Sequence, residues 1–520
     1  MNAIVVLWLA LLVPATASRA KAAWYLAETE NFRVYADASK RTTKKLAATL
    51  EDFDWLLRLM TGLKSDPPPD KFDVYLIKDT KQLRRYTGFG RNIGGYYRAT
   101  PTGTAAFAQR TRRISGAASK HWDLSSQTIL FHEYAHHFML RHFPHAYPTW
   151  YIEGFAEYVS TARFEGDEVT VGDYAVGRAA TLLHYKWLPL QQVLKPGGMP
   201  SDPEDKAVFY AQSWLLTHYL LRDPERQHQL AQYLRSTPTA PTLERDFKAA
   251  FGIPISAMNG DLKAYMRGSG AEQISRTKMI LKRPDTAAAQ VAKLSNSAND
   301  VLVIAAKLDI GIEGAFYAEA LRDVARAKEK HVGDYLAERT WAHANSLFGE
   351  RAAGREALQS LAEQRPNDVK PLFYLGLSYL LEARENAGNA AKKAALIERS
   401  HRTFAAAFQR DNAHYPTLYF YYKAQSAPIS QAERQVLEEA AYLAPQVAQI
   451  RYDLADLWAR QNDPNLRTKA AQLFAILAAD PHGGSVAAMA AARAAPIQAA
   501  SQGLPHQQAH KRGARTTPLR

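Results

Sequence analysis

The sequence predicts an α+β part at the N-terminal end, followed by an all-α part built from repeated helix pairs. Short strand-like segments alternate with a helix over about the first 110 residues, whereas helical spacing of apolar residues dominates from Ser126 onward. In the C-terminal half, turn signals return at similar intervals. A chain of 520 residues also exceeds the size at which single hydrophobic cores stop growing, so we expect at least two domains.

The first elements are short strands and one amphipathic helix. Aromatic and β-branched residues favour strands at residues 32–35, 72–77, 94–97 and 104–109. Between the first two, apolar residues from Leu46 to Leu57 follow helical spacing, which predicts a helix over 44–60 that ends before Gly62.

Helices are expected over 126–141, 149–162 and 205–221, and a helical segment at 247–266 closes the first domain. We therefore assign residues 24–270 to the first domain. The Gly268-Ser269-Gly270 run begins a linker over 271–284.

Residues 285–482 are interpreted as tetratricopeptide-like helical repeats. Turn signals recur at 366–368, 411–412, 444–445 and 480–481, each after an Ala-rich helix, and two of the three steps are close to the 34-residue period of such repeats. An irregular α-bundle is the alternative. Stacked helix pairs contact mainly their neighbours, so we expect 285–480 to fold without the first domain. Residues 483–520 lack periodicity and are expected to be a disordered basic tail.

The N-terminus predicts export. An apolar run over 4–13 is followed by Pro14 and by Ala15-Thr16-Ala17, a small-x-small cleavage pattern, so residues 1–22 are interpreted as a signal peptide. The segment lacks Lys and Arg before the apolar run, which leaves a buried N-terminal strand as the alternative. We expect a periplasmic or secreted product without a stable membrane span, since ten apolar residues are too few to cross a bilayer.

The amino-acid composition limits the kinds of site that this chain can form. The chain has no cysteine, which excludes disulfides, thiolate metal sites and a cysteine nucleophile, so any metal must be held by His, Asp or Glu. The net charge of +14 is spread along the chain without a basic stripe interleaved with aromatic residues. Nucleic acid is therefore not an expected partner.

The segment His132-Glu133-Tyr134-Ala135-His136 fits the HExxH pattern. On a helix, His132 and His136 lie on one face and can converge on one ion, for which zinc is a suitable choice. Glu133 lies beside the metal and can take a proton from a bound water. His137 lies off this face, and we expect it to be hydrogen-bonded or solvated rather than a ligand.

A second segment, Trp150-Tyr151-Ile152-Glu153-Gly154-Phe155-Ala156-Glu157-Tyr158, follows on the next predicted helix. A carboxylate from this helix would complete the three protein ligands of a catalytic zinc site. Glu153 and Glu157 are four residues apart and point the same way, so spacing alone leaves either as the ligand, and two surface carboxylates are a further alternative.

These two segments resemble those of the gluzincin metallopeptidases, in particular the peptidase MA-like domains of exported bacterial proteins. The resemblance covers about residues 24–270, and implies a zincin-like fold with Glu153 as the third zinc ligand and Glu157 as a carboxylate that supports a ligand His. The segment 209–214 is similar to the family's helix after the active site. Tyr210 within it could donate to the oxyanion, or could be a packed aromatic side chain.

We therefore expect a zinc-dependent metallopeptidase that acts on a protein or peptide in the cell envelope, with a possible protein partner on the repeats. One alternative is a non-catalytic binding protein whose zinc site is structural or vestigial. Another is a zinc hydrolase that acts on a non-peptide amide. The presence of Glu133 favours an enzyme, because a structural zinc site does not need this residue.

Overall fold

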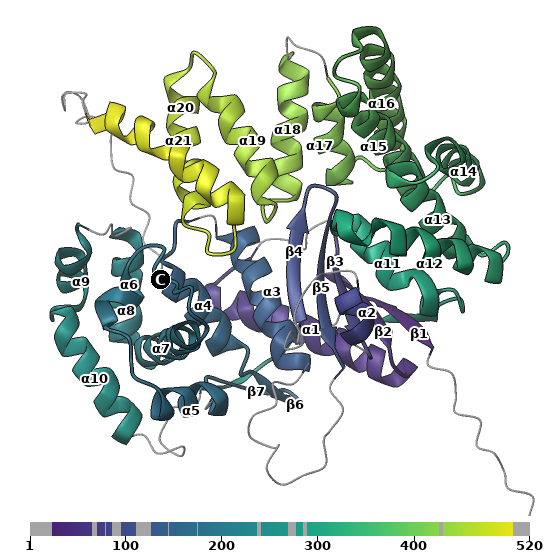
Figure 1. Cartoon of the computed structure of the whole chain (residues 1–520). Helices are drawn as coiled ribbons and strands as arrows, with labels where there is room; N and C mark the ends of the chain where they lie inside the picture. The colour runs from purple at the N-terminus through teal and green to yellow at the C-terminus, as the bar shows by residue number, and fades with distance from the viewer. Residues whose placement is uncertain are drawn as a thin grey trace, which may run out of the picture.

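The computed structural model describes residues 23–64, 70–78, 80–85, 95–110, 126–143, 145–173, 175–236, 241–268, 277–283, 289–425 and 430–502. It is a mixed α+β structure in which an N-terminal sheet is followed by an all-helical C-terminal region (Figure 1). This arrangement confirms the predicted order of an α+β part and an all-α part. The expected signal peptide at 1–22 lies outside the described residues.

The main sheet has six strands in the order β4-β5-β3-β2-β1-β9. Its parallel pairs are β2 with β3 and β3 with β5, and the other neighbours are antiparallel. The strands span β1 (Trp24–Glu28), β2 (Phe32–Asp37), β3 (Phe72–Ile77), β4 (Gly95–Thr100), β5 (Gly103–Gln109) and β9 (Gln290–Lys293). The four strands expected from the sequence are thus present, with β1 and β9 added at one side.

Side chains alternate between the two faces of this sheet along each strand, and helices pack on both faces. On one face, Val74 and Ala106 pack with helices α1 (Lys40–Thr61) and α3 (Ser126–His142). On the other, Tyr75 and Phe107 pack with helix α11 (Ala298–Ile310) of the C-terminal region. The sheet therefore shares a core with both halves of the chain.

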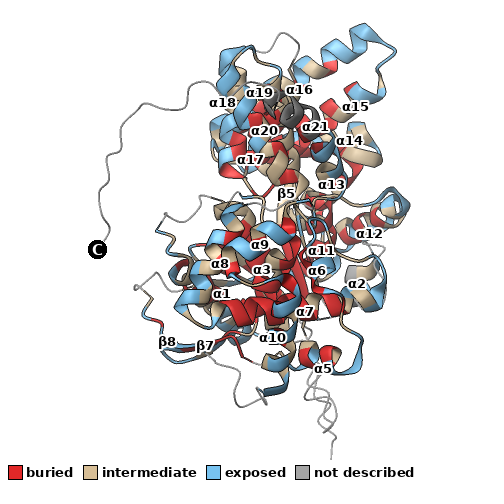
Figure 2. Cartoon of the chain, turned by 90° about the vertical axis from the view of Figure 1, so that its left-hand side faces the viewer, coloured by how far each residue is buried: buried red, intermediate tan, exposed pale blue. Residues whose placement is uncertain are grey.

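A second core lies around α7 and is helical. Its members are α4 (Thr149–Val159), α5 (Val176–His184), α6 (Leu190–Leu194), α7 (Pro203–Leu221), α8 (Pro224–Ser236), α9 (Leu243–Phe251) and α10 (Ile255–Gly268). In Figure 2, buried residues concentrate in the lower half of the picture, around the helices labelled α3 and α7. The segment expected at 247–266 to close the first domain contains parts of two helices, α9 and α10. They are separated at Gly252, which takes the left-handed φ of 74°, and at Pro254, which directly precedes α10.

A small antiparallel sheet of β6 (Arg163–Glu165), β7 (Glu168–Val171) and β8 (Thr277–Ile280) lies beside these helices. Strand β8 falls within the segment expected to be a linker. A short helix, α2 (Thr80–Arg85), follows β3.

The C-terminal region is a curved row of helices in Figure 1, in which each helix packs against the next. It continues from α11 with α12 (Tyr317–Lys330), α13 (Tyr335–Phe348), α14 (Arg351–Gln364), α15 (Lys370–Glu385), α16 (Ala390–Arg410), α17 (Tyr415–Lys423), α18 (Gln431–Leu443), α19 (Ala448–Ala459), α20 (Pro464–Ala478) and α21 (Gly484–Gln502). All four expected turns fall between helices. Within the described residues, no helix has both the length and the apolar character needed to cross a bilayer.

Two features differ from the sequence expectations. Strand β9 pairs with β1, and α11 covers the main sheet, so residues 285–480 share a sheet and a core with the first domain. Their independent folding stays a prediction. Residues 484–502 form helix α21 rather than disordered chain, and residues 503–520 lie outside the described part. Alanine-rich sequence has a high helix propensity, and Ala490 packs with the buried residues of α20, so this helix needs no strong apolar periodicity.

Candidate metal centre

Helix α3 places the first two candidate ligands. Phe131, Ala135 and Phe138 point into the core with the main sheet, which fixes the rotation of the helix. His132 and His136 lie on the adjacent side, one turn apart, and their Nε2 atoms are 3.0 Å apart. His136 is buried, whereas the side chain of His132 is 19% exposed.

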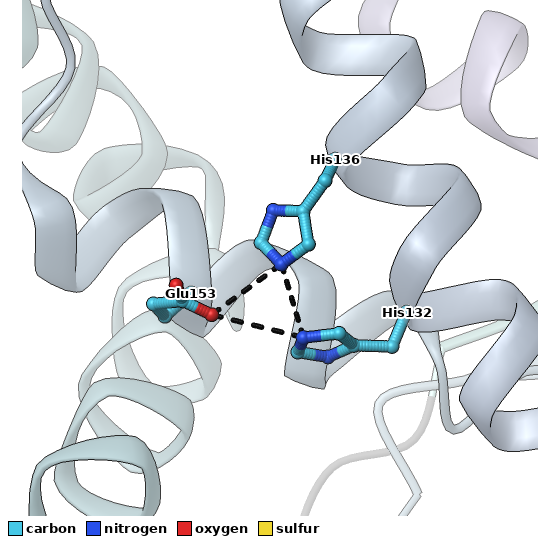
Figure 3. A group of neighbouring side chains, drawn as sticks. All are labelled: His132, His136 and Glu153. Carbon is cyan, nitrogen blue, oxygen red and sulfur yellow. Dashed lines mark hydrogen bonds and ion pairs between the residues drawn. The ribbon is translucent and has the colours of Figure 1, made fainter. Parts of the chain in front are cut away.

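Helix α4 brings the third candidate ligand toward these imidazoles. The Oε2 atom of Glu153 lies 3.4 Å from Nε2 of His136 and 3.7 Å from Nε2 of His132 (Figure 3). Glu153 is fully buried. The two imidazoles and the carboxylate point at one another, so the structure brings together the three residues that the sequence predicted as ligands.

Gly154 allows α4 to lie close to α7. A Cβ atom at this position would be 2.2 Å from Oγ1 of Thr217 and 2.3 Å from the carbonyl oxygen of Ser213, both on α7. No side chain fits at such distances without a shift of the backbone. The glycine after Glu153 therefore sets how deeply this carboxylate is buried.

The surroundings of Glu153 and His132 favour the protonation states in which these two side chains bind a metal. Burial raises the pKa of Glu153, but His136 and His482 outweigh this effect and hold the pKa well below its ordinary value. Burial and the neighbouring His136 lower the pKa of His132. A carboxylate and a neutral imidazole are the forms in which these side chains bind a metal.

Glu157 lies one turn beyond Glu153 and has different partners. Arg178 on α5 binds it with two nitrogens, Nε 2.8 Å from Oε2 and Nη2 2.5 Å from Oε1. Oε1 also lies 3.4 Å from Nδ1 of His132, the nitrogen that faces away from the candidate metal position. Glu157 therefore contacts a ligand imidazole, and the position facing both Nε2 atoms belongs to Glu153.

Glu133 and Tyr210 both lie near this group. Glu133 is half-buried on α3, and its charge acts on His132, Tyr210 and His482. The ring of Tyr210 on α7 is 6.5 Å from the ring of His132, and the guanidinium of Arg178 lies 5.1 Å from its centre. Burial raises the pKa of Tyr210 well above its ordinary value, so its hydroxyl remains a proton donor at neutral pH.

His137 does not take part in the group. It is buried, its ring packs 4.4 Å from Phe72, and its Nδ1 lies 3.1 Å from the hydroxyl of Tyr97. It is thus hydrogen-bonded, one of the two states expected from the sequence.

Two residues of this site were not predicted from the sequence. Arg178 lies on α5, and no sequence motif connects it with Glu157. His482, in the turn between α20 and α21, places its Nε2 2.7 Å from Oε1 of Glu153, and its ring 4.8 Å from that of His136. Burial lowers the pKa of His482, but Glu153 outweighs this effect and raises the pKa to about 9.

The donor set fits a metal ion. The ligand atoms of His132, His136 and Glu153 all lie within 4.8 Å of one another. Two imidazole nitrogens and one buried carboxylate oxygen could hold a divalent cation while leaving part of its coordination sphere open.

Comparison with known proteins assigns neither a family nor a function to this chain. No family model matches the chain, and no curated protein or solved structure matches it at a significant level. A function for this chain therefore has to be inferred from the geometry of the group itself.

Proposed function

We propose that this chain is a zinc-dependent peptidase with a zincin-like catalytic domain of the gluzincin kind. The observation that carries the proposal is the convergence of His132, His136 and Glu153, with Glu133 on the same helix as the histidines but outside the ligand group. Two histidines and one glutamate are a donor set typical of catalytic zinc in peptidases. A site that only stabilises the fold would not need the additional carboxylate.

A bound zinc ion supplies Lewis-acid chemistry and lowers the pKa of a water molecule to about 7. Glu133 accepts the proton of the attacking water and returns it to the leaving amine. Tyr210 donates a hydrogen bond from its hydroxyl group to the oxygen that gains charge. Glu157, held by Arg178, keeps the ring of His132 oriented through Nδ1.

The biological setting is proposed from the sequence. An exported chain places the reaction in the periplasm or outside the cell, with a protein or peptide as substrate. The helical region offers a curved surface of stacked helix pairs, which is the kind of surface that repeat proteins use to bind partners.

The test is the substitution Glu133→Gln. The amide keeps the shape of the side chain but cannot accept a proton at neutral pH, so we expect peptide cleavage to fall by about 10²–10⁴-fold with unchanged zinc content. The measurement pairs cleavage of a peptide library with metal analysis of the same samples. Equal cleavage by wild type and Glu133→Gln would show that Glu133 is not the general base. A wild-type chain that binds zinc but cleaves nothing would favour the non-catalytic alternative.

A further inference from the structure

The turn between α20 and α21 brings a residue of the helical region to the candidate metal centre. Nε2 of His482 lies 2.7 Å from Oε1 of Glu153, whereas Oε2 of the same carboxylate faces Nε2 of His132 and of His136. The two carboxylate oxygens thus have separate partners. The side chain of His482 is 48% exposed, and that of Glu153 is fully buried.

His482 does not belong to the ligand group itself. The set of mutually close ligand atoms contains His132, His136 and Glu153 and, within the described chain, does not extend to His482. Its ring instead packs edge-on against His136, with ring centres 4.8 Å apart and an interplanar angle of 67°. The residue therefore contacts two candidate ligands from outside the position where their donor atoms converge.

The turn that carries His482 is held by hydrogen bonds to Asp480 within the turn. The amide of His482 donates to Oδ1 of Asp480 at 2.9 Å, and the amide of Gly483 donates to the carbonyl oxygen of Asp480 at 3.2 Å. Gly484 has a φ of 52°, a left-handed value that glycine adopts without steric cost, and α21 begins there.

Other contacts hold the helical region against elements of the first half of the chain. Arg141, near the end of α3, donates to Oε1 of Gln446 in the turn before α19 at 3.2 Å. The hydroxyl of Tyr415 on α17 donates to the carbonyl oxygen of Thr100 on β4 at 3.1 Å. The position of His482 thus follows from an extended interface and does not depend on one loop.

We propose that His482 is a positioning residue that holds Oε1 of Glu153, so that Glu153 presents a single oxygen, Oε2, to the metal. This inference rests on the proposed metal site. Partners that orient a ligand carboxylate tune metal affinity, and their loss typically weakens it by about 10–100-fold. The helical region thereby completes a metal centre whose ligands all come from the first half of the chain.

The test measures metal affinity in the full chain by competition with a chromogenic zinc chelator. We expect His482→Phe, which keeps a ring against His136 but cannot donate, to weaken zinc binding by about 10–100-fold. His482→Gln, which can still donate to Glu153, should stay close to wild type. His145→Ala is the matched control, because His145 is exposed and has no role in the proposal.

A spectroscopic measurement separates positioning from a general loss of folding. Cobalt(II) in place of zinc gives visible absorption bands that depend on ligand geometry, and we expect them to change in His482→Phe but not in His482→Gln. Wild-type affinity and wild-type bands in His482→Phe would overturn the inference and leave the zinc proposal intact. Equal losses in both variants would also overturn it, since donation would then not matter. A wild-type chain that binds no zinc would overturn both proposals.

Discussion

Glu153 and Glu157 occupy successive turns of α4 and face the same helix, yet their partners give them different chemistry. Glu153 is fully buried and presents Oε2 to two imidazoles, whereas Glu157 is neutralised by Arg178 and reaches only Nδ1 of His132. A carboxylate already bound by a guanidinium is a weaker candidate for a metal ligand. The structure therefore favours Glu153 for the ligand position that the spacing alone left open.

Removing each carboxylate should have a different effect on zinc. Glu153→Ala takes away one of three protein ligands, so we expect the purified variant to contain no zinc after dialysis. Glu157→Ala removes only the support of His132, and we expect zinc affinity to fall by about 10–100-fold. Metal analysis and chelator competition measure these effects, with Glu165→Ala on β6 as an exposed control. Full zinc content in Glu153→Ala, with loss in Glu157→Ala, would exchange the two assignments.

Local spacing explains which site residues the sequence could predict. His132, Glu133 and His136 lie within five residues of one predicted helix, and Glu153 lies in the next predicted helix. The pattern can therefore be recognised without knowledge of the fold. Arg178 and His482 reach the site only through tertiary packing, from α5 and from the last turn of the helical region. Neither Arg178 nor His482 lies in a sequence motif that would identify it as a residue of the site.

At the scale of elements, the contact between α4 and α7 decides where Glu153 lies. Gly154 faces Ser213 and Thr217 on α7 at distances that leave no room for a side chain. The same two helices also supply Glu157 and Tyr210, so their separation sets the width of the site as well as the depth of the carboxylate.

Gly154→Ala should therefore destabilise the protein. The added methyl group forces α4 away from α7, and overpacking of this kind costs about 1–3 kcal/mol. Gly260→Ala in α10 is the matched control, because its added Cβ meets nothing within 4 Å. There the better helix propensity of alanine should stabilise by up to about 1 kcal/mol. Urea unfolding measures both, and equal midpoints for the two variants would contradict the role of Gly154.

Strong local patterns also explain which elements were predicted. Strand β3 and helix α3 begin where the sequence indicates, because apolar periodicity and turn residues agree there. Strand β9, Gln290–Lys293, is short and largely exposed, so it carries little of the alternation by which strands are recognised. The break between α9 and α10 was not predicted, although Gly252 and Pro254 are residue types that commonly end a helix.

At the scale of the whole molecule, the sheet and the helical region form one interior. Trp24, Tyr75 and Phe107 pack with Val301 and Ile304 of α11. No local sequence pattern could predict this docking, because the strands of the sheet and helix α11 have the sequence patterns of their own secondary structure whether or not they pack together. The domain boundary expected near residue 285 therefore lies between two parts of the chain that share one core.

A chain that ends at residue 283 should expose this sheet face. We expect residues 23–283 to aggregate or to bind an apolar fluorescent dye, because large exposed apolar patches on monomers are rare. A chain that ends at residue 462 keeps α11 to α19 and serves as the control that should stay monomeric. Gel filtration and dye fluorescence compare the two. A monomeric 23–283 fragment with no more dye binding than the control would show that the two parts fold separately.

Strand β9 also has a consequence for the order of events during folding. Tyr25 pairs with Lys293, so the edge of β1 stays open until most of the first three hundred residues have been made. Contacts between residues so distant in sequence form slowly, because a long loop must close first. An open edge with unpaired amide and carbonyl groups meanwhile invites pairing with other chains. The edge of β1 in a newly made chain is therefore available for pairing with another chain until β9 has been made.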